Sequence, residues 1–250
     1  MKINSLIRYT IQQFINDFTD RYSIFSYRTV EKFAYKDGNY DTIIEDYSLP
    51  FKFSFGATKL CLIFPDCKEY VYKIPLYYRF DCYDERDLAR CASYEAKCGR
   101  YERFLSTDNL CEVEVNLYKD AQNIGIGYCF AKEFQFMEYH GIPVYAQERI
   151  EQTYFDRQES DYYEVKEADY EIREEIFCKQ NEIDNKFVNE FITNKFFIED
   201  MYKYSGEDFG LLLEFIAAND INDLHNENVG YDFMGNPKIM DYSGFMPTDD

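Results

Sequence analysis

NDLHNENVGYDFMGNPKIMDYSGF, residues 222–245, is the stretch that decides how the fold of this chain is interpreted. Asp223 and Asn228 follow a predicted helix, and Asp241 closes a predicted strand–turn–strand unit whose turn holds Gly235. A loop and the end of a neighbouring strand can meet at one point, so we expect these three side chains to converge. Two carboxylates and an amide oxygen are hard ligands that suit Mg²⁺ bound together with substrate phosphates.

At these residues the sequence resembles the protein-kinase-like superfamily, whose catalytic loop reads H-R-D-L-x-x-x-N and whose metal motif reads D-F-G. Here the loop reads I-N-D-L-H-N-E-N and the metal motif D-Y-S-G. The D-L-H form is more similar to small-molecule kinases such as aminoglycoside and choline phosphotransferases. The resemblance implies that Asp223 is the catalytic base, Asn228 a metal ligand and Asp241 the principal metal ligand.

The N-terminal half of the chain offers the remaining parts of such a site in the expected order. Lys73 ends a run that resembles the strand with the phosphate-binding lysine, and Glu95 lies in the following predicted helix, where the family has the partner of that lysine. Gly56 stands one strand earlier, at the place of the glycine-rich loop. Glu148 and Ile150 end a strand where the hinge and the adenine contacts would lie. The implied cofactors are ATP and Mg²⁺.

The hydrophobic pattern predicts an α+β protein, and the resemblance implies a two-lobed, kinase-like fold with a β-rich first lobe and a reduced, mainly helical second lobe. We expect residues 1–50 to form an N-terminal helix and extension, residues 51–150 the first lobe, and residues 151–250 the second. The expected elements are a helix at the N-terminus with Leu6, Ile7, Ile11, Phe14, Ile15 and Phe18 on one side, a hairpin of Phe51–Phe64 and Glu69–Pro75, a helix over 84–104, two strands meeting at His140-Gly141, and helices over 186–204 and after Gly206.

Composition and charge narrow the classes of partner. The formal net charge of −20 repels phosphate backbones, so nucleic acid and anionic membranes are unfavourable partners. The sequence has no apolar run long enough to span a membrane and no signal-peptide pattern at its start. Its 8 cysteines form no C-x-x-C pair, which argues against a zinc site. We therefore expect a cytoplasmic protein with reduced cysteines, whose partners are a nucleotide and a protein or small-molecule acceptor.

Three functions remain open from the sequence. The first is an ATP-dependent phosphotransferase. The second is a pseudokinase-like module that binds a nucleotide or a protein without turnover, because the glycine-rich loop is reduced to Gly56, Ile221 and Asn222 replace the family's His and Arg, and the sequence ends at Asp250. The third is a structural or inhibitory acidic protein that mimics nucleic acid through its charge and would bind a basic partner. Nucleotide binding separates the first two from the third, and turnover separates the first from the second.

Overall fold

The computed structural model describes residues 2–22, 25–35, 43–46, 48–56, 58–76, 109–152, 195–219, 221, 224 and 228–243. The chain divides into two compact units, and each is described by itself. The first unit comprises residues 1–115 and 133–147, and the second comprises residues 116–132 and 148–250. The helices described within residues 1–50 lie in the first unit.

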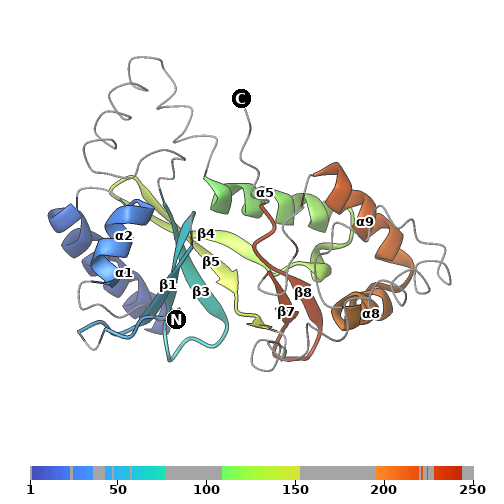
Figure 1. Cartoon of the computed structure of the whole chain (residues 1–250), viewed down its shortest axis with the longest axis horizontal. Coiled ribbons are helices and arrows are strands. Elements are labelled where there is room, and N and C mark those ends of the chain that lie inside the picture. Colours follow the sequence, from blue (N-terminus) through green and yellow to red (C-terminus); the bar gives the residue numbers. More distant parts are fainter. Residues whose placement is uncertain are drawn as a thin grey trace, which may run out of the picture. The chain divides into compact units, whose positions relative to one another are not determined.

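The first unit is built on a five-stranded sheet with the order β1-β2-β3-β5-β4 (Figure 1). Its strands are β1 (Lys52–Phe55), β2 (Lys59–Ile63), β3 (Tyr70–Pro75), β4 (Glu133–Tyr139) and β5 (Ile142–Glu148). The pairs β1–β2, β2–β3 and β4–β5 are antiparallel, which confirms the expected strands that meet at His140-Gly141. The run from Phe51 to Phe64, expected as one arm of a hairpin, is two strands, because the chain turns back at Gly56.

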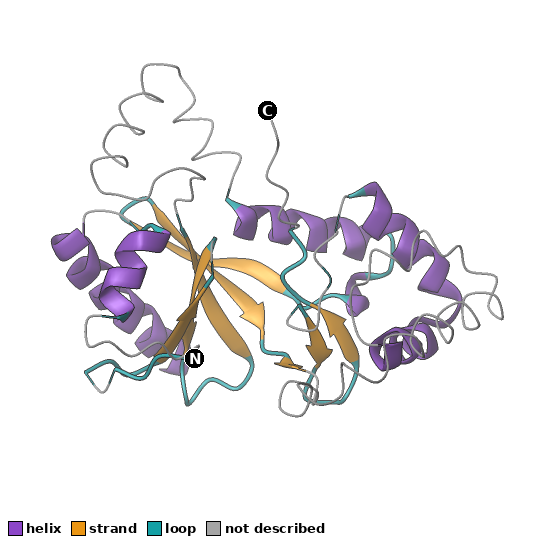
Figure 2. Ribbon diagram, viewed as in Figure 1, coloured by secondary structure: helices purple, strands orange, loops and turns teal. Residues whose placement is uncertain are grey.

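Two N-terminal helices cover one face of this sheet (Figure 2). Helix α1 (Lys2–Tyr22) buries the expected apolar stripe, except that Leu6 is 66% exposed, because it lies about 100° around the helix from Ile7. Helix α2 (Tyr27–Ala34) begins with a capping box between Ser26 and Thr29. Aromatic rings fill the space between these helices and the sheet. The buried rings are Phe14, Phe18, Phe25, Phe33, Phe51, Phe53, Phe64, Tyr72 and Phe136.

The opposite face of the sheet carries polar side chains, and helix α5 (Leu110–Asn123) contributes to it from its first turns. Cys61 and Lys73 are directly opposite in the β2–β3 register, and residues on one strand alternate between faces, so Lys59, Cys61 and Lys73 share this face. Asn109 fixes the start of α5. Its side chain accepts a hydrogen bond from the Glu112 amide and donates one to the Tyr145 hydroxyl at 2.7 Å, which ties the helix to β5.

The second unit combines helices with a small antiparallel sheet of order β6-β7-β8. Its described elements are η1 (Gly127–Cys129), β6 (Glu151–Gln152), α8 (Lys195–Ser205), η4 (Gly206–Asp208), α9 (Phe209–Ala218), β7 (Val229–Tyr231) and β8 (Pro237–Ile239). Its apolar core joins Phe130, Phe197 and Leu212 to Val229 and Ile239 of the β7–β8 hairpin. The mixed α+β class is thus confirmed, and so are the helices expected before and after Gly206 within the described residues. The helix predicted over 84–104 lies outside them.

Candidate functional site

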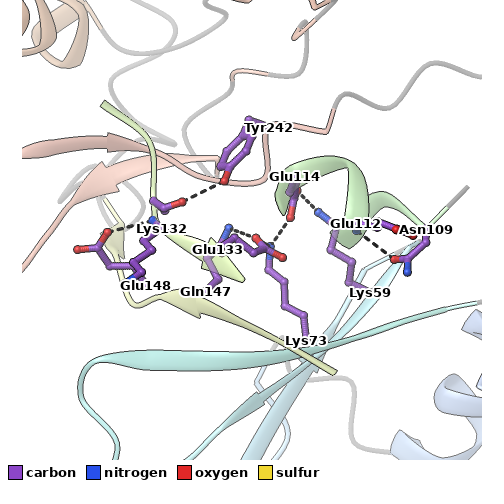
Figure 3. A network of polar contacts seen from close by, with 11 residues as sticks. Lys59, Lys73, Asn109, Glu112, Glu114, Lys132, Glu133, Gln147, Glu148 and Tyr242 are labelled. Atoms are coloured by element: carbon purple, nitrogen blue, oxygen red, sulfur yellow. Dashed lines mark hydrogen bonds and ion pairs between the residues drawn. The ribbon is translucent and has the colours of Figure 1, made fainter. Parts of the chain in front are cut away.

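The polar face of the five-stranded sheet holds a buried ion-pair cluster around Glu114 (Figure 3). The Lys73 ammonium donates to Glu114 Oε2 at 2.9 Å, and the Lys59 ammonium donates to Glu114 Oε1. Glu114 is fully buried, and the two lysines are 3% and 4% exposed. One carboxylate from α5 therefore holds two lysines from adjacent strands.

Glu133 at the start of β4 extends the cluster. Its Oε2 accepts from Lys73 at 3.3 Å and from the Gln147 side chain at 2.8 Å, and Gln147 is also its partner in the β4–β5 register. Its other oxygen, Oε1, is buried and has no hydrogen-bond partner among the residues that the structure describes. We name the five residues Lys59, Lys73, Glu114, Glu133 and Gln147 the lysine cluster.

Burial and charge set opposite protonation preferences for the two carboxyl groups. Burial raises the pKa of Glu114, but Lys59 and Lys73 outweigh it and hold this pKa well below the ordinary value, so Glu114 is ionised. Burial, with Glu114 nearby, raises the pKa of Glu133 well above its ordinary value, and Lys73 offsets this only in part. Burial also opposes the charge on Lys73, but Glu114 and Glu133 raise its pKa above the ordinary value.

Asn228 and Asp241, predicted to converge, lie at the same end of the β7–β8 hairpin. Val229 pairs with Ile239, so Asn228 immediately precedes one strand and Asp241 follows the other by two residues. The Met240 amide donates to the Asn228 carbonyl at 2.8 Å and closes this end of the hairpin. Asn228 is buried and Asp241 is half-buried. The expected strand–turn–strand unit is confirmed, and its pairing places the backbones of Asn228 and Asp241 at the same end of the hairpin.

Asp241 has an unusual backbone conformation, with a φ of 53°. Of the described non-glycine residues, His140 also has a positive φ, and the two-residue β4–β5 turn with Gly141 explains that conformation. Asp241 lies in no such turn. The next residue, Tyr242, is buried, and its ring packs on Phe130. Its hydroxyl donates to the Ala131 carbonyl at 3.1 Å (Figure 3). Residues with such a sparsely populated backbone conformation cluster at functional sites.

The other predicted nucleotide contacts have structural partners of their own. Glu148 ends β5, and its carboxylate accepts from the Lys132 amide at 3.1 Å. Ile150 is half-buried, and its side chain packs closely on Gly230 of β7. A Cβ added at position 230 would clash with the Ile150 side chain and with the Glu151 carbonyl. Gly56 is exposed, and its amide donates to the Lys59 carbonyl at 3.0 Å. A Cβ at Gly56 would meet open space, so packing does not require glycine there.

Two predicted residues, Glu95 and Asp223, lie outside the described residues. Among the described residues, Lys73 pairs with Glu114. The sequence analysis did not identify Glu114, Lys59, Glu133 or Gln147 as site residues. By its sequence alone, the segment CEVEVNLYKDAQNIG (residues 111–125) fits either a helix or a helix–strand pair, and that ambiguity hid Glu114. A helical period would have revealed it, because Cys111, Glu114 and Val115 fall on one face and all three are buried.

The described part of the chain holds neither a cluster of metal-binding side chains nor a membrane-spanning helix. No three His, Cys, Asp or Glu side chains gather there in a group that could hold a metal ion. This finding does not count against Asn228 and Asp241 as Mg²⁺ ligands, since Mg²⁺ needs only one or two protein ligands when phosphates and water complete its shell. The described helices include none that is both long and apolar enough to cross a bilayer.

Comparisons with known proteins place the chain in no family. No family model, curated protein or solved structure matches it.

Proposed function

We propose that this chain is an ATP- and Mg²⁺-dependent phosphotransferase of the protein-kinase-like superfamily, with a hydroxyl group of a protein or small molecule as acceptor. The observation that carries the proposal is the buried pair between Lys73 on the third strand and Glu114 on the next helix that the structure describes. In protein kinases, a lysine on the third strand pairs with a helix glutamate and contacts the α- and β-phosphates.

The charge state of Glu114 supports this role. An ionised, buried Glu114 keeps Lys73 protonated and holds its ammonium in one place, at 2.9 Å from Glu114 Oε2. A fixed ammonium at a site with little water stabilises phosphate charge more strongly than a solvated lysine does, because no reorganisation is needed when the ligand arrives. Lys73 would thus position the nucleotide and neutralise part of its charge.

Asn228 and Asp241 fit Mg²⁺ by the chemistry of their donors. Both offer hard oxygen ligands from one end of the β7–β8 hairpin, and Asp241 has a left-handed backbone there. When bound, Mg²⁺ would neutralise charge on the β- and γ-phosphates. Asp223 would accept the proton of the acceptor hydroxyl as that oxygen bonds to the γ-phosphorus and ADP leaves.

The test is transfer of labelled γ-phosphate from ATP, with Mg²⁺, to a host lysate and to a panel of small alcohols and aminoglycosides. Asp241→Ala and Asp223→Asn should each abolish transfer while their circular dichroism and melting temperature stay close to those of the wild type. Asp120→Asn is the matched control, since Asp120 is an exposed carboxylate on α5. A variant Asp241→Ala that transfers phosphate as fast as the wild type would refute the proposal.

A second candidate, a nucleotide-binding module without turnover, is favoured by one observation. The Gly56 amide is already engaged by the Lys59 carbonyl, so this donor is not available to cradle a phosphate. A thermal-shift titration with ATP and Mg²⁺ separates the two functions, because a ligand that binds the folded state alone raises the melting temperature. Stabilisation without transfer to any acceptor supports the module, and transfer to any acceptor excludes it.

A further inference from the structure

The turn that joins β7 to β8 carries the two most exposed large apolar side chains of the residues that the structure describes (Figure 1). Phe233 is 86% exposed and Met234 is 71% exposed, so neither contributes to the apolar core of the second unit. Single exposed apolar residues are common on protein surfaces, but folding does not explain two adjacent large ones in one turn. We name Phe233 and Met234 the apolar tip.

The turn is held by the residues around the apolar tip. Asp232 Oδ1 accepts from the amides of Met234 at 2.8 Å and Asn236 at 2.9 Å, and Asp232 Oδ2 accepts from the Asn236 side chain at 3.0 Å. The Gly235 amide donates to the Asp232 carbonyl at 2.9 Å, and Gly235 has a φ of 81°, which favours glycine. Asp232, Gly235 and Asn236 thus build a three-residue hairpin loop that is closed by a residue with positive φ.

The same turn makes no demand on the side chains of Phe233 and Met234. Neither residue has a positive φ, and small polar residues, which are usual in turns, would be better solvated at both positions. A hydrogen-bonded turn that holds two apolar side chains in water is preorganised for binding, because little backbone freedom is lost when a partner covers them. Aromatic residues and methionine are also enriched in the cores of protein interfaces.

The charge of the chain distinguishes the surfaces that could cover the apolar tip: a bilayer, a second copy of the chain, or another protein. A net charge of −20 makes two copies repel each other and makes an anionic membrane repel the chain. Two apolar side chains without a basic patch are also too few to anchor a protein stably to a bilayer. The same field attracts a protein that carries positive charge around an apolar pocket.

The base of the turn carries acidic groups of its own. Asp232 lies in the turn, Asp200 accepts from the hydroxyl of the last β7 residue at 2.9 Å, and the exposed Glu151 pairs with that same residue across β6 and β7. Lys203 lies 3.8 Å from Asp200, and Lys238 is buried, with its ammonium on a backbone carbonyl at 2.6 Å. A partner that covers the tip therefore meets carboxylates at its edge, which favours lysine and arginine on the partner.

We propose that the apolar tip is a docking element, which inserts Phe233 and Met234 into an apolar pocket of another protein with lysine and arginine side chains at the rim of that pocket. The tip lies at the end of the hairpin opposite to Asn228 and Asp241, so this assignment does not rest on the proposed function. Two anchors suffice for such a contact, because a few buried residues supply most of the binding energy of an interface.

The test starts from the full chain with the photoreactive residue p-benzoylphenylalanine in place of Phe233, irradiated in a host lysate. Mass spectrometry identifies the cross-linked protein, which is then purified and titrated by calorimetry with the wild type, Phe233→Ser and Met234→Ser. Leu6→Ser is the matched control, because Leu6 is an apolar side chain of the first unit that is 66% exposed. The melting temperatures of all variants should match that of the wild type, since these side chains lie in water.

Each tip variant should lower the affinity for the purified partner about tenfold or more, and Leu6→Ser should keep the wild-type affinity. The wild-type affinity should also fall between about 0.1 M and 1 M salt, because screening weakens the attraction between the acidic chain and a basic rim. The cross-link should lie in an apolar pocket of the partner that is bordered by lysine or arginine.

Several outcomes would overturn the assignment. The first is that no protein cross-links at position 233, and the second is a purified partner that binds Phe233→Ser as tightly as the wild type or binds independently of salt. Cross-linking of the purified chain to itself, with sedimentation that depends on concentration, would make a second copy the occupant. Flotation of the wild type, but not of Phe233→Ser, with neutral phosphatidylcholine vesicles would make a bilayer the occupant.

Discussion

The two faces of the five-stranded sheet are built from opposite kinds of side chain. One face packs aromatic rings against α1 and α2, and Phe18 and Phe25 stack there with ring centroids 4.1 Å apart and an interplanar angle of 9°. The other face buries the lysine cluster, in which Glu114 and Glu133 contact two ammonium groups. Both faces exclude water, but through very different interactions.

The two kinds of interaction contribute differently to the stability of the unit, and only the polar face offers charged groups to a ligand. Burying aromatic area is favourable by itself, at about 25 cal/mol for each Å² removed from water. Burying ion pairs is close to neutral or unfavourable, because desolvation offsets the attraction. A lysine cluster this completely buried is therefore not explained by stability, and this supports a functional role. Four substitutions test this difference between the two faces.

The largest effect is expected from Glu114→Gln on the polar face. The substitution keeps the shape of the side chain but leaves Lys59 and Lys73 buried without their common carboxylate. Breaking such a buried pair should lower the free energy of unfolding by about 3–5 kcal/mol. Under the proposed function it should also abolish ATP binding at temperatures where the variant is folded. Urea unfolding and calorimetric titration measure the two effects.

Glu112→Gln is the control for this experiment, since Glu112 lies on the same helix and is exposed. Its change in stability should stay below about 1 kcal/mol, as expected for one carboxylate in the first turn of a helix. A Glu114→Gln variant as stable as Glu112→Gln would show that the cluster is not buried as the structure describes.

Phe18→Ala on the apolar face should lower the free energy of unfolding to a similar extent but leave the affinity for ATP unchanged. Phe18 is 1% exposed and its ring packs against Phe14, Phe25 and Phe33. Truncation of such a ring to alanine costs roughly 3–5 kcal/mol. The affinity for ATP, measured well below the melting temperature, should equal that of the wild type. Leu6→Ala on the same helix is the control, and a loss of ATP affinity in Phe18→Ala alone would contradict the division between the faces.

Local patterns in the sequence predicted the apolar face and the hairpins better than the polar cluster. The α1 stripe and the His140-Gly141 turn follow from helical period and turn chemistry, and the structure confirms both. Asn228 and Asp241 were predicted as neighbours because a hairpin fixes its own register. Glu114 could not be found in this way, because its contact with Lys73 joins residues 41 positions apart and depends on how α5 packs on the sheet.

Glu133→Gln should reveal a smaller effect that depends on pH. Glu114, Lys73 and Lys59 face this carboxyl group, and its folded-state pKa lies well above the ordinary value of 4.5. The folded chain therefore keeps a proton that the unfolded chain loses above about pH 4.5. The contribution of Glu133 to the stability of the wild type therefore falls as pH rises. Glutamine cannot ionise and can still accept from Gln147. The stability of the variant relative to the wild type should thus increase steadily with pH.

Urea unfolding midpoints of both proteins at pH 4, 5, 6, 7 and 8 measure this difference. Acid loss of the Glu114 ion pairs occurs in both proteins, because the folded-state pKa of Glu114 is lowered and this contribution is lost only as pH falls. Subtraction therefore isolates Glu133. Curves that stay parallel over the whole range would mean that Glu133 is ionised in the folded chain.

The smallest effect is expected at the surface pair of Lys52 with Glu45, which contains the same chemical groups as the pair of Lys73 with Glu114. Both side chains of the surface pair are 47% exposed, so water screens their attraction and hydrates either partner when the other is removed. Lys52→Gln should change the free energy of unfolding by less than about 1 kcal/mol and leave ATP affinity untouched. The change should shrink further in 1 M salt, because the Debye length falls to about 3 Å. If urea unfolding gives Lys52→Gln and Glu114→Gln equal costs, burial is not what distinguishes the two pairs, and the functional reading of the polar face loses its physical basis.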